Sequence, residues 1–226
     1  MKIRFLGHAC FEVVIKGKNI LFDPFISPNE KAKHIDINTL KPDYILISHG
    51  HEDHVADVLN IAQSCNAKLV SNFEIISWFG NKGHENGHPM NHGGKWTFDF
   101  GSVKYVNAVH SSALPDGSYG GNPGGFVITS DEGNFYFAGD TALTYDMKLI
   151  GNTTKLDFAV LPIGDNFTMD VDDAIIAAEF IKCDNILGVH YDTFGFIEIN
   201  KSEAKEKFKK AGKTLHLLEI GETTEL

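Results

Sequence analysis

The sequence predicts an α/β fold in which two β-sheets pack face to face and helices cover their outer faces. Short apolar runs separated by turn residues are typical of strands, and they occur as IRFLG, FEVVIKGKNILFD, YILIS, AKLVSN, SVKYVNAVH, GGFVITS, NFYFAGD, DFAVLPIG and NILGVH. Strands therefore dominate, and a helix is expected after the third strand of each half of the chain. Stacked sheets with outer helices bury the apolar side chains of such a set.

The same order of segments occurs twice along the chain. GKNILFDPF around Asp23 resembles GNFYFAGDT around Asp140, and two later pairs follow in the same order, KPDYILIS with KLDFAVLPI and AKLVSN with DNILGVH. We therefore expect a single domain over residues 1–226, built from two related halves at about 1–100 and 101–226. Coincidental similarity among apolar strands is the alternative interpretation.

Turn and cap residues set several boundaries. The glycine after Lys16 predicts a hairpin, Asp170 is a predicted N-cap, and Gly212 is expected to end the last helix. VADVLNIAQSC has helical spacing of its apolar residues, and TLHLLEIG is predicted to be the final strand. FGNKGHENGHPMNHGGK is expected to form a loop, because its glycines and Pro89 would interrupt a regular element.

Composition and charge argue against several classes of protein. The net charge of the 226-residue chain is −10, which does not suit a broad nucleic-acid surface. Cysteines are few and dispersed, at Cys10, Cys65 and Cys183, as in proteins with reduced thiols. The sequence has no signal-peptide pattern. It also has no apolar run near the ~20 residues of a membrane helix. We expect a cytoplasmic protein without membrane insertion, and a homo-oligomer is left open.

The six residues HGHEDH at 49–54 follow an apolar strand and precede a predicted helix. His49 and His51 are two positions apart and can converge on one point, while Asp53 and His54 can face a second point a few ångström away. Imidazole nitrogens and carboxylate oxygens suit zinc, iron or manganese. The motif therefore predicts half of two metal sites, and a solvated polar turn is the alternative.

Three further candidate ligands each follow an apolar run and precede a turn. They are His110 after VKYVNAV, Asp140 after NFYFAG and His190 after NILGV. Turns at strand ends commonly carry functional residues. Each residue alone would more often be structural, but their order after the 49–54 motif favours a shared metal site.

These residues resemble the metallo-β-lactamase superfamily, which has an HxHxDH motif, a distant histidine, an aspartate in GDT and a final histidine. The segments FLGHACF, LFDPF, PMNHGG, HSSALPDG and LPIGDNFTM are similar to a compact branch of metal-dependent hydrolases. That branch is related to the ascorbate-phosphate lactonase and the N-acyl-phosphatidylethanolamine phospholipase. The resemblance covers nearly the whole chain and implies a four-layer αββα sandwich.

The resemblance also implies a ligand set and a reaction. One metal would be held by His49, His51 and His110, the other by Asp53, His54 and His190, with Asp140 bridging. Two divalent ions are implied, with zinc expected and manganese, iron or nickel as alternatives. Two cations that share a water lower its pKa and yield a bridging hydroxide near neutral pH. Asp53 would orient this nucleophile for cleavage of an ester, lactone or phosphodiester bond in a small-molecule substrate.

The two-halves interpretation adds two candidates that do not come from the family. His8 at the end of the first strand corresponds to His110, and Asp23 corresponds to Asp140. We expect both to face the metals without binding them directly. Asp23 would accept a hydrogen bond from a ligand histidine, and His8 would contact the substrate or protonate the leaving group. A buried strand end for His8 and a turn cap for Asp23 are the alternatives.

Three other functions suit the sequence less well than hydrolysis of a small-molecule substrate. A tRNA-processing type of nuclease does not suit the acidic charge, and a regulatory module with little catalysis does not suit a complete ligand set. A flavin-linked di-iron role would replace His51 with glutamate. The repeated histidines His84, His88 and His92 are expected in a loop that borders the active site, rather than in a third metal site.

Overall fold

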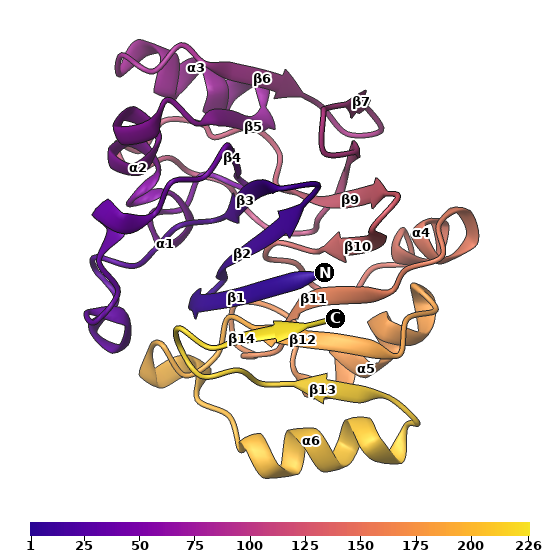
Figure 1. The fold of residues 1–226 in the computed structure, drawn as a ribbon. Helices are drawn as coiled ribbons and strands as arrows, with labels where there is room; N and C mark the ends of the chain where they lie inside the picture. Colours follow the sequence, from indigo (N-terminus) through magenta and orange to yellow (C-terminus); the bar gives the residue numbers. More distant parts are fainter.

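The computed structural model describes residues 1–226, and it consists of two seven-stranded sheets packed against each other (Figure 1). The first sheet has the strand order β14-β1-β2-β3-β4-β5-β6, and the second has the order β13-β12-β11-β10-β9-β8-β7. Helices lie on the outer face of each sheet, which gives the predicted αββα sandwich. The fold prediction is thus confirmed.

The first sheet carries three helices and two short 3-10 turns on its outer side. Its strands are Lys2–Gly7 (β1), Cys10–Ile15 (β2), Lys18–Phe22 (β3), Tyr44–Leu46 (β4), Lys68–Asn72 (β5), Gly87–Met90 (β6) and Thr223–Glu225 (β14). The helices are Glu52–Val55 (α1), Val58–Cys65 (α2) and Phe73–Asn81 (α3), and the 3-10 turns are Glu30–Ala32 and Ile37–Thr39.

The second sheet carries three helices and one 3-10 turn. Its strands are Lys95–Thr97 (β7), Ser102–Asn107 (β8), Gly124–Ser130 (β9), Gly133–Phe137 (β10), Phe158–Pro162 (β11), Asn185–Val189 (β12) and Thr214–His216 (β13). The helices are Met147–Thr153 (α4), Val171–Phe180 (α5) and Lys201–Lys210 (α6), and the 3-10 turn is Gly195–Ile197.

Both faces of each sheet are buried, because the inner faces meet and the outer faces are covered. Along β4, Tyr44 and Leu46 belong to the core between the sheets, whereas Ile45 belongs to the core under α2 and α3. A third apolar core lies between the second sheet and α4, α5 and α6. This double burial explains why the strands appear in the sequence as nearly continuous apolar runs.

The two sheets share one pattern of strand pairing. In the first sheet β1, β2 and β3 pair antiparallel and β3 to β6 pair parallel. In the second sheet β8, β9 and β10 pair antiparallel and β10 to β13 pair parallel. The remaining strands are exchanged, since β7 pairs with β8 and the C-terminal β14 pairs with β1. This pattern supports the expectation of two related halves.

Several local predictions are correct. Lys16 and Gly17 both have positive φ, as a two-residue hairpin turn requires. Asp170 accepts a hydrogen bond from the Asp173 amide as the N-cap of α5. Gly212, with φ of +74°, follows the end of α6.

Other local predictions are wrong. The segment expected to be a loop contains the end of α3 and the strand β6, which tolerates Pro89 because it is the edge strand of its sheet. The helix expected from Val55 is divided into α1 and α2, and the final predicted strand ends at His216 before the chain returns as β14. The short helix α4 was not predicted at all.

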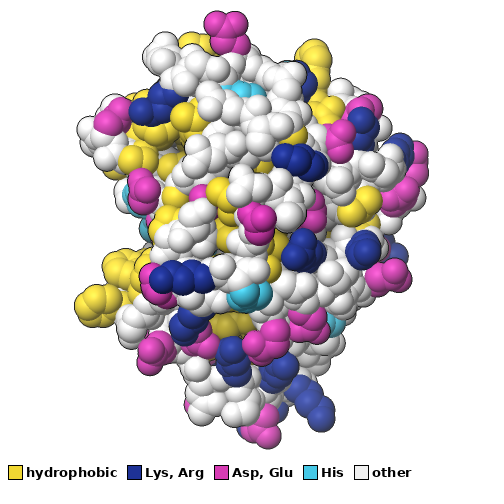
Figure 2. Space-filling model, turned by 60° about the vertical axis from the view of Figure 1, so that its left-hand side comes forward, with side chains coloured by type: hydrophobic (Ala, Val, Ile, Leu, Met, Phe, Trp, Pro, Cys, Tyr) yellow, Lys and Arg dark blue, Asp and Glu magenta, His cyan; other side chains and the backbone are white.

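No helix of the structure has the length and apolar character needed to cross a membrane. On the face drawn in Figure 2, acidic and basic side chains are interspersed, and no broad basic patch is visible.

Phe22 lies in the aromatic packing between the two sheets. Its buried ring stacks on Phe11 at 4.4 Å and meets Phe135 and Phe137 of the opposite sheet edge-on. Phe22→Ala should therefore lower the free energy of unfolding by about 3–5 kcal/mol, measured by urea denaturation. The control Phe73→Ala, at a side chain that is 60% exposed, should change it by less than about 0.5 kcal/mol. Equal effects of the two changes would contradict this description of the core.

Candidate metal centre

The histidine motif lies where β4 gives way to α1. The strand β4 ends at Leu46. His51 is the N-cap residue of α1, but its side chain makes no capping hydrogen bond to the helix. The ring of His51 is therefore free to face other groups. Asp53 and His54 lie in α1, and the His54 ring lies 4.1 Å from that of His49. One short turn thus places four polar side chains at a single edge of the first sheet.

The second sheet brings three more side chains to the same place. His110 follows β8, Asp140 follows β10, and His190 follows β12 directly. His190 has a φ of +56°, and so has His8 after β1, while Asp23 after β3 has +40°. Such values are uncommon for residues other than glycine and are often found at functional sites.

One carboxylate oxygen occupies the middle of the cluster. Asp140 Oδ2 lies 3.0 Å from His190 Nε2 and 3.3 Å from His54 Nε2. The same oxygen lies 3.7 Å from His110 Nε2 and 4.0 Å from His49 Nε2. A single oxygen that faces imidazoles from both sequence-predicted sets has the position required of a shared ligand.

The candidate ligand atoms form three overlapping groups, of which Asp23, His49 and His54 make one and the other two match the sequence-predicted sets. His49, His51 and His110 make the first of these two, and Asp53, His54 and His190 make the second together with His8. Within each group the candidate ligand atoms lie within 4.8 Å of one another. The structure therefore brings all seven sequence-predicted ligands together, and it adds His8 to the second group.

Asp23 lies directly behind the ligand histidines. Its Oδ2 accepts hydrogen bonds from His54 Nδ1 at 2.8 Å and from the Ser48 hydroxyl, while its Oδ1 accepts from the Ser48 amide. Ser48 Oγ also lies 2.9 Å from His49 Nδ1. The carboxylate thus fixes one histidine of the second group directly and one of the first group through Ser48.

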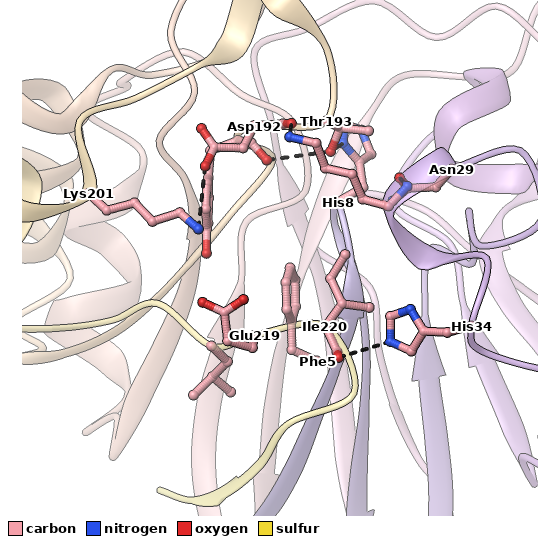
Figure 3. Close-up of a pocket in the computed structure, with 12 residues that line it drawn as sticks. Phe5, His8, Asn29, His34, Asp192, Thr193, Lys201, Glu219 and Ile220 are labelled. Carbon is pink, nitrogen blue, oxygen red and sulfur yellow. Dashed lines mark hydrogen bonds and ion pairs between the residues drawn. The ribbon is translucent and has the colours of Figure 1, made fainter.

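His8 is held between Asp53 and a residue of the second half. Its Nε2 lies 3.0 Å from Asp53 Oδ2, and its Nδ1 lies 2.9 Å from Thr193 Oγ1. Because an ionised carboxylate only accepts, Nε2 carries the proton and Nδ1 accepts from the Thr193 hydroxyl. His8 and Thr193 also line a cavity of about 260 Å³, and Figure 3 shows both residues at its wall.

The site is strongly polarised. Burial raises the pKa of Asp140, but the charges of the nearby His190 and His54 outweigh this effect and hold that pKa well below its usual value. Burial lowers the pKa of His190, yet the neighbouring carboxylates, Asp140 first and then Asp53, raise it to about 9. Burial and the charge of His190 lower the pKa of His8 to about 4. Two ionised carboxylates among crowded imidazoles form a site that favours a cation.

Comparison with known proteins decides the family. Residues 2–190 match a family model described as the β-lactamase superfamily domain. The chain belongs to this superfamily. Relatives described as UPF0173 metal-dependent hydrolases include one from Flavobacterium johnsoniae, 64% identical over 226 residues, and one from Christiangramia forsetii, 60% identical over 227 residues. In both, the match covers 100% of each chain.

Solved structures agree with this assignment. The metallo hydrolase Igni18 from Ignicoccus hospitalis is 33% identical, with a TM-score of 0.89 over 100% of this chain and 98% of its own. The isothiocyanate hydrolase from Delia radicum gut bacteria, 20% identical with a TM-score of 0.81 over 100% of this chain and 99% of its own, shares the fold. The protein is therefore a metal-dependent hydrolase of the β-lactamase superfamily.

The residues present fit a bound divalent metal. His54 Nε2 and Asp140 Oδ1 are buried and have no hydrogen-bond partner within the protein. Buried polar atoms rarely remain unpaired, and these two belong to residues that face the centre of the cluster. Imidazole nitrogen with carboxylate oxygen is a donor set that suits zinc, manganese and iron.

The sequence did not single out the supporting hydroxyls. Ser48 joins Asp23 to His49, Thr193 holds His8, and Ser111 Oγ lies 3.3 Å from His51 Nε2. Ser48 and Ser111 are next to candidate ligands in the chain, which is the only signal that could have indicated them. Thr193 lies three residues after His190.

The expectation that the histidines at 84, 88 and 92 border the active site is wrong. His84 Nε2 bonds to the Ala67 carbonyl, and His92 Nε2 bonds to the Pro123 carbonyl. His88 lies in β6 with its ring 4.9 Å from that of Trp96. All three stabilise the chain around β6, and none belongs to a group of candidate metal ligands.

Asp23 provides a test of the hydrogen bonds behind the cluster. Asp23→Asn replaces one accepting oxygen with a donor, so either His54 or Ser48 loses its partner. We expect zinc affinity to fall about 10- to 100-fold, measured by competition with a chelating dye. Asp57→Asn is the matched control, because Asp57 is also buried and accepts from two backbone amides, those of Ile26 and Ser27. Unchanged zinc affinity in Asp23→Asn would show that the bond to His54 does not matter for binding.

Proposed function

We propose that the centre holds two divalent ions and that the protein hydrolyses an ester, lactone or phosphodiester bond of a small-molecule substrate. The observation that carries the proposal is the position of Asp140 Oδ2, which faces histidines of both ligand groups. One group would hold the first ion with His49, His51 and His110. The other would hold the second ion with Asp53, His54 and His190, and zinc is the expected metal.

When bound, two such ions lower the pKa of a shared water and polarise the substrate's carbonyl or phosphoryl oxygen. The protein's own groups have separate tasks. Asp53 is the more accessible of the two central carboxylates, with a side chain 26% exposed against 3% for Asp140. It is therefore the group placed to orient the attacking oxygen and to accept its proton.

His8 acts on Asp53 in this proposal, and not on the substrate. Its side chain is fully covered, so the direct contact with substrate expected from the sequence does not fit the geometry. Its Nε2–H instead donates to Asp53 Oδ2. The Thr193–His8–Asp53 chain of hydrogen bonds thus fixes the orientation of the carboxylate that faces the nucleophile.

Two of the alternative functions, a nuclease and a regulatory module, have less support. Nucleic-acid cleavage would call for a basic surface along a phosphate backbone, whereas the net charge is −10 and basic residues are interspersed with acidic ones in Figure 2. A regulatory module without catalysis has no need of an accessible carboxylate beside the ligand histidines.

Metal stoichiometry is the first test. Zinc-loaded protein should contain two ions per chain by elemental analysis. Asp140→Ala removes an oxygen that faces both groups, so it should weaken the binding of both ions. His110→Ala removes a ligand of one group and should chiefly empty one position. A wild-type protein that saturates at one ion would contradict the proposed pair.

Catalysis is the second test. The zinc-loaded protein should cleave an activated ester or phosphodiester, and a chelator should abolish the activity until metal is restored. His51→Ala removes a candidate ligand and should lower turnover by more than the about 10- to 100-fold typical of a group that only supports a ligand. His88→Ala, at a histidine that packs on Trp96, is the matched control and should retain activity. Activity that survives in His51→Ala would place the chemistry elsewhere.

A further inference from the structure

Three phenylalanines beside the candidate metal centre are exposed to solvent. Phe167 is 51% exposed, Phe194 is 39% exposed and Phe196 is 76% exposed. Phe167 lies between β11 and α5, and the other two lie between β12 and α6. Single exposed apolar side chains are normal on a protein surface, so the position and support of these three decide whether they matter.

Their rings make two separate sets of contacts, one with the site and one between the two loops. The Phe194 ring lies 5.4 Å from that of His8, which bonds to Asp53, and 6.2 Å from that of Phe25. The Phe196 ring lies 6.3 Å from that of Phe167 in an edge-on arrangement. Phe194 thus lies against a side chain of the site, and Phe196 on the same loop lies against Phe167 of the neighbouring loop.

The loop that carries Phe194 and Phe196 is fixed by Asp192. This residue has a φ of +60°, and its carboxylate accepts from the Ile199 amide and pairs with Lys201 at 3.5 Å. Its backbone amide donates to Ile197, and its carbonyl accepts from Lys31. Figure 3 shows Lys201 reaching toward Asp192 across the cavity behind His8. The two phenylalanines are therefore held outward by a braced loop.

The loop that carries Phe167 is closed in a similar way. Asp165 and Asn166 both have positive φ, and the Asp165 amide donates to the Met169 carbonyl. The Met169 amide donates to the carbonyl of Thr141, the neighbour of Asp140. Strained backbone of this kind is kept where it serves a purpose. Here it holds an apolar ring in solvent next to the segment that carries the shared carboxylate.

We propose that Phe167, Phe194 and Phe196 form an apolar rim that binds an apolar acyl group of the substrate while the metals hold the bond to be cleaved. The proposal rests on the hydrolase function proposed above and narrows its substrate class. The rim adjoins the centre through His8 and Thr141, so a substrate that spans both is the occupant that the geometry favours.

The test is a series of p-nitrophenyl esters that differ only in the acyl chain: acetate, butyrate and octanoate. For the zinc-loaded protein kcat/KM should rise with chain length, by up to about fourfold for each methylene that the rim buries. Phe196→Ser and Phe167→Ser should flatten this rise. A wild-type protein without chain-length dependence, or variants that keep it, would overturn the proposal.

Tyr145→Ser is the matched control. Tyr145 is 74% exposed, close to the value for Phe196, and stacks on Phe180 at the C-terminal end of α5. The dependence on chain length should survive in this variant. Sedimentation of each protein separates substrate binding from self-association. If Phe196→Ser only converts a dimer to a monomer and keeps the chain-length dependence, the rim is an interface between copies and the proposal fails.

Binding provides a readout that does not require turnover. Calorimetry should show that octanoate binds the zinc-loaded protein more tightly than acetate does, and that Phe196→Ser removes the difference. If no ester is cleaved but this difference is present, the rim is supported and the hydrolysed bond was wrongly assigned. If esters are cleaved without any preference in rate or binding, the rim proposal alone is overturned.

Discussion

A buried carboxylate facing several imidazoles is the constraint on which this end of the molecule depends. Asp140 is 3% exposed, and its Oδ2 lies within 4.0 Å of nitrogens from four histidines. A charged group removed from water costs several kcal/mol unless other charges and hydrogen bonds compensate for it. The compensating groups come from both sheets, so the sheets have to stack with these strand ends at one edge. The sheets therefore have to pack in the arrangement that also assembles the site.

A second buried carboxylate, that of Asp23, constrains the path of the backbone near the site. Asp23 holds Ser48, and the chain after β10 has to pass close to that serine to deliver Asp140. Gly139 makes the approach possible, because it has a φ of +62° and a Cβ there would lie 2.6 Å from the Cβ of Ser48. A side chain at Gly139 would thus displace Asp140 from the histidines without touching any of them.

The predictable parts of the fold are the strands whose successive side chains are buried. Continuous apolar runs indicated most of the strands, and residues just beyond the runs, such as His110 and Asp140, indicated the site. Boundaries that depend on tertiary contacts were missed. Pro89 and the glycines near it argued against β6, yet an edge strand needs few backbone donors. The contacts of His84, His88 and His92 come from Ala67, Trp96 and Pro123, and no spacing in the sequence indicates these partners.

Part of the site was equally beyond the reach of the sequence. Correspondence between the halves placed His8 and Asp23 near the centre, because equivalent strands end at the same edge. This correspondence did not indicate that the His8 side chain would be shielded from solvent. The shielding comes from Thr193 and from the rings of His190 and Phe194. The solvent exposure of a side chain depends on segments far apart in the chain, so a sequence pattern within one segment does not predict it.

The exchanged strands have a consequence for how the chain reaches its folded state. β14 contributes residues 223–225 to the sheet that begins with β1, so the first half has an unpaired edge strand until the end of the chain is available. Pairing of residues so distant in sequence carries a large entropy of loop closure and slows folding. During synthesis on a ribosome β1 would remain an open edge, and such an edge invites pairing with other chains. Completion of the first sheet thus has to wait until residues 223–225 have been made.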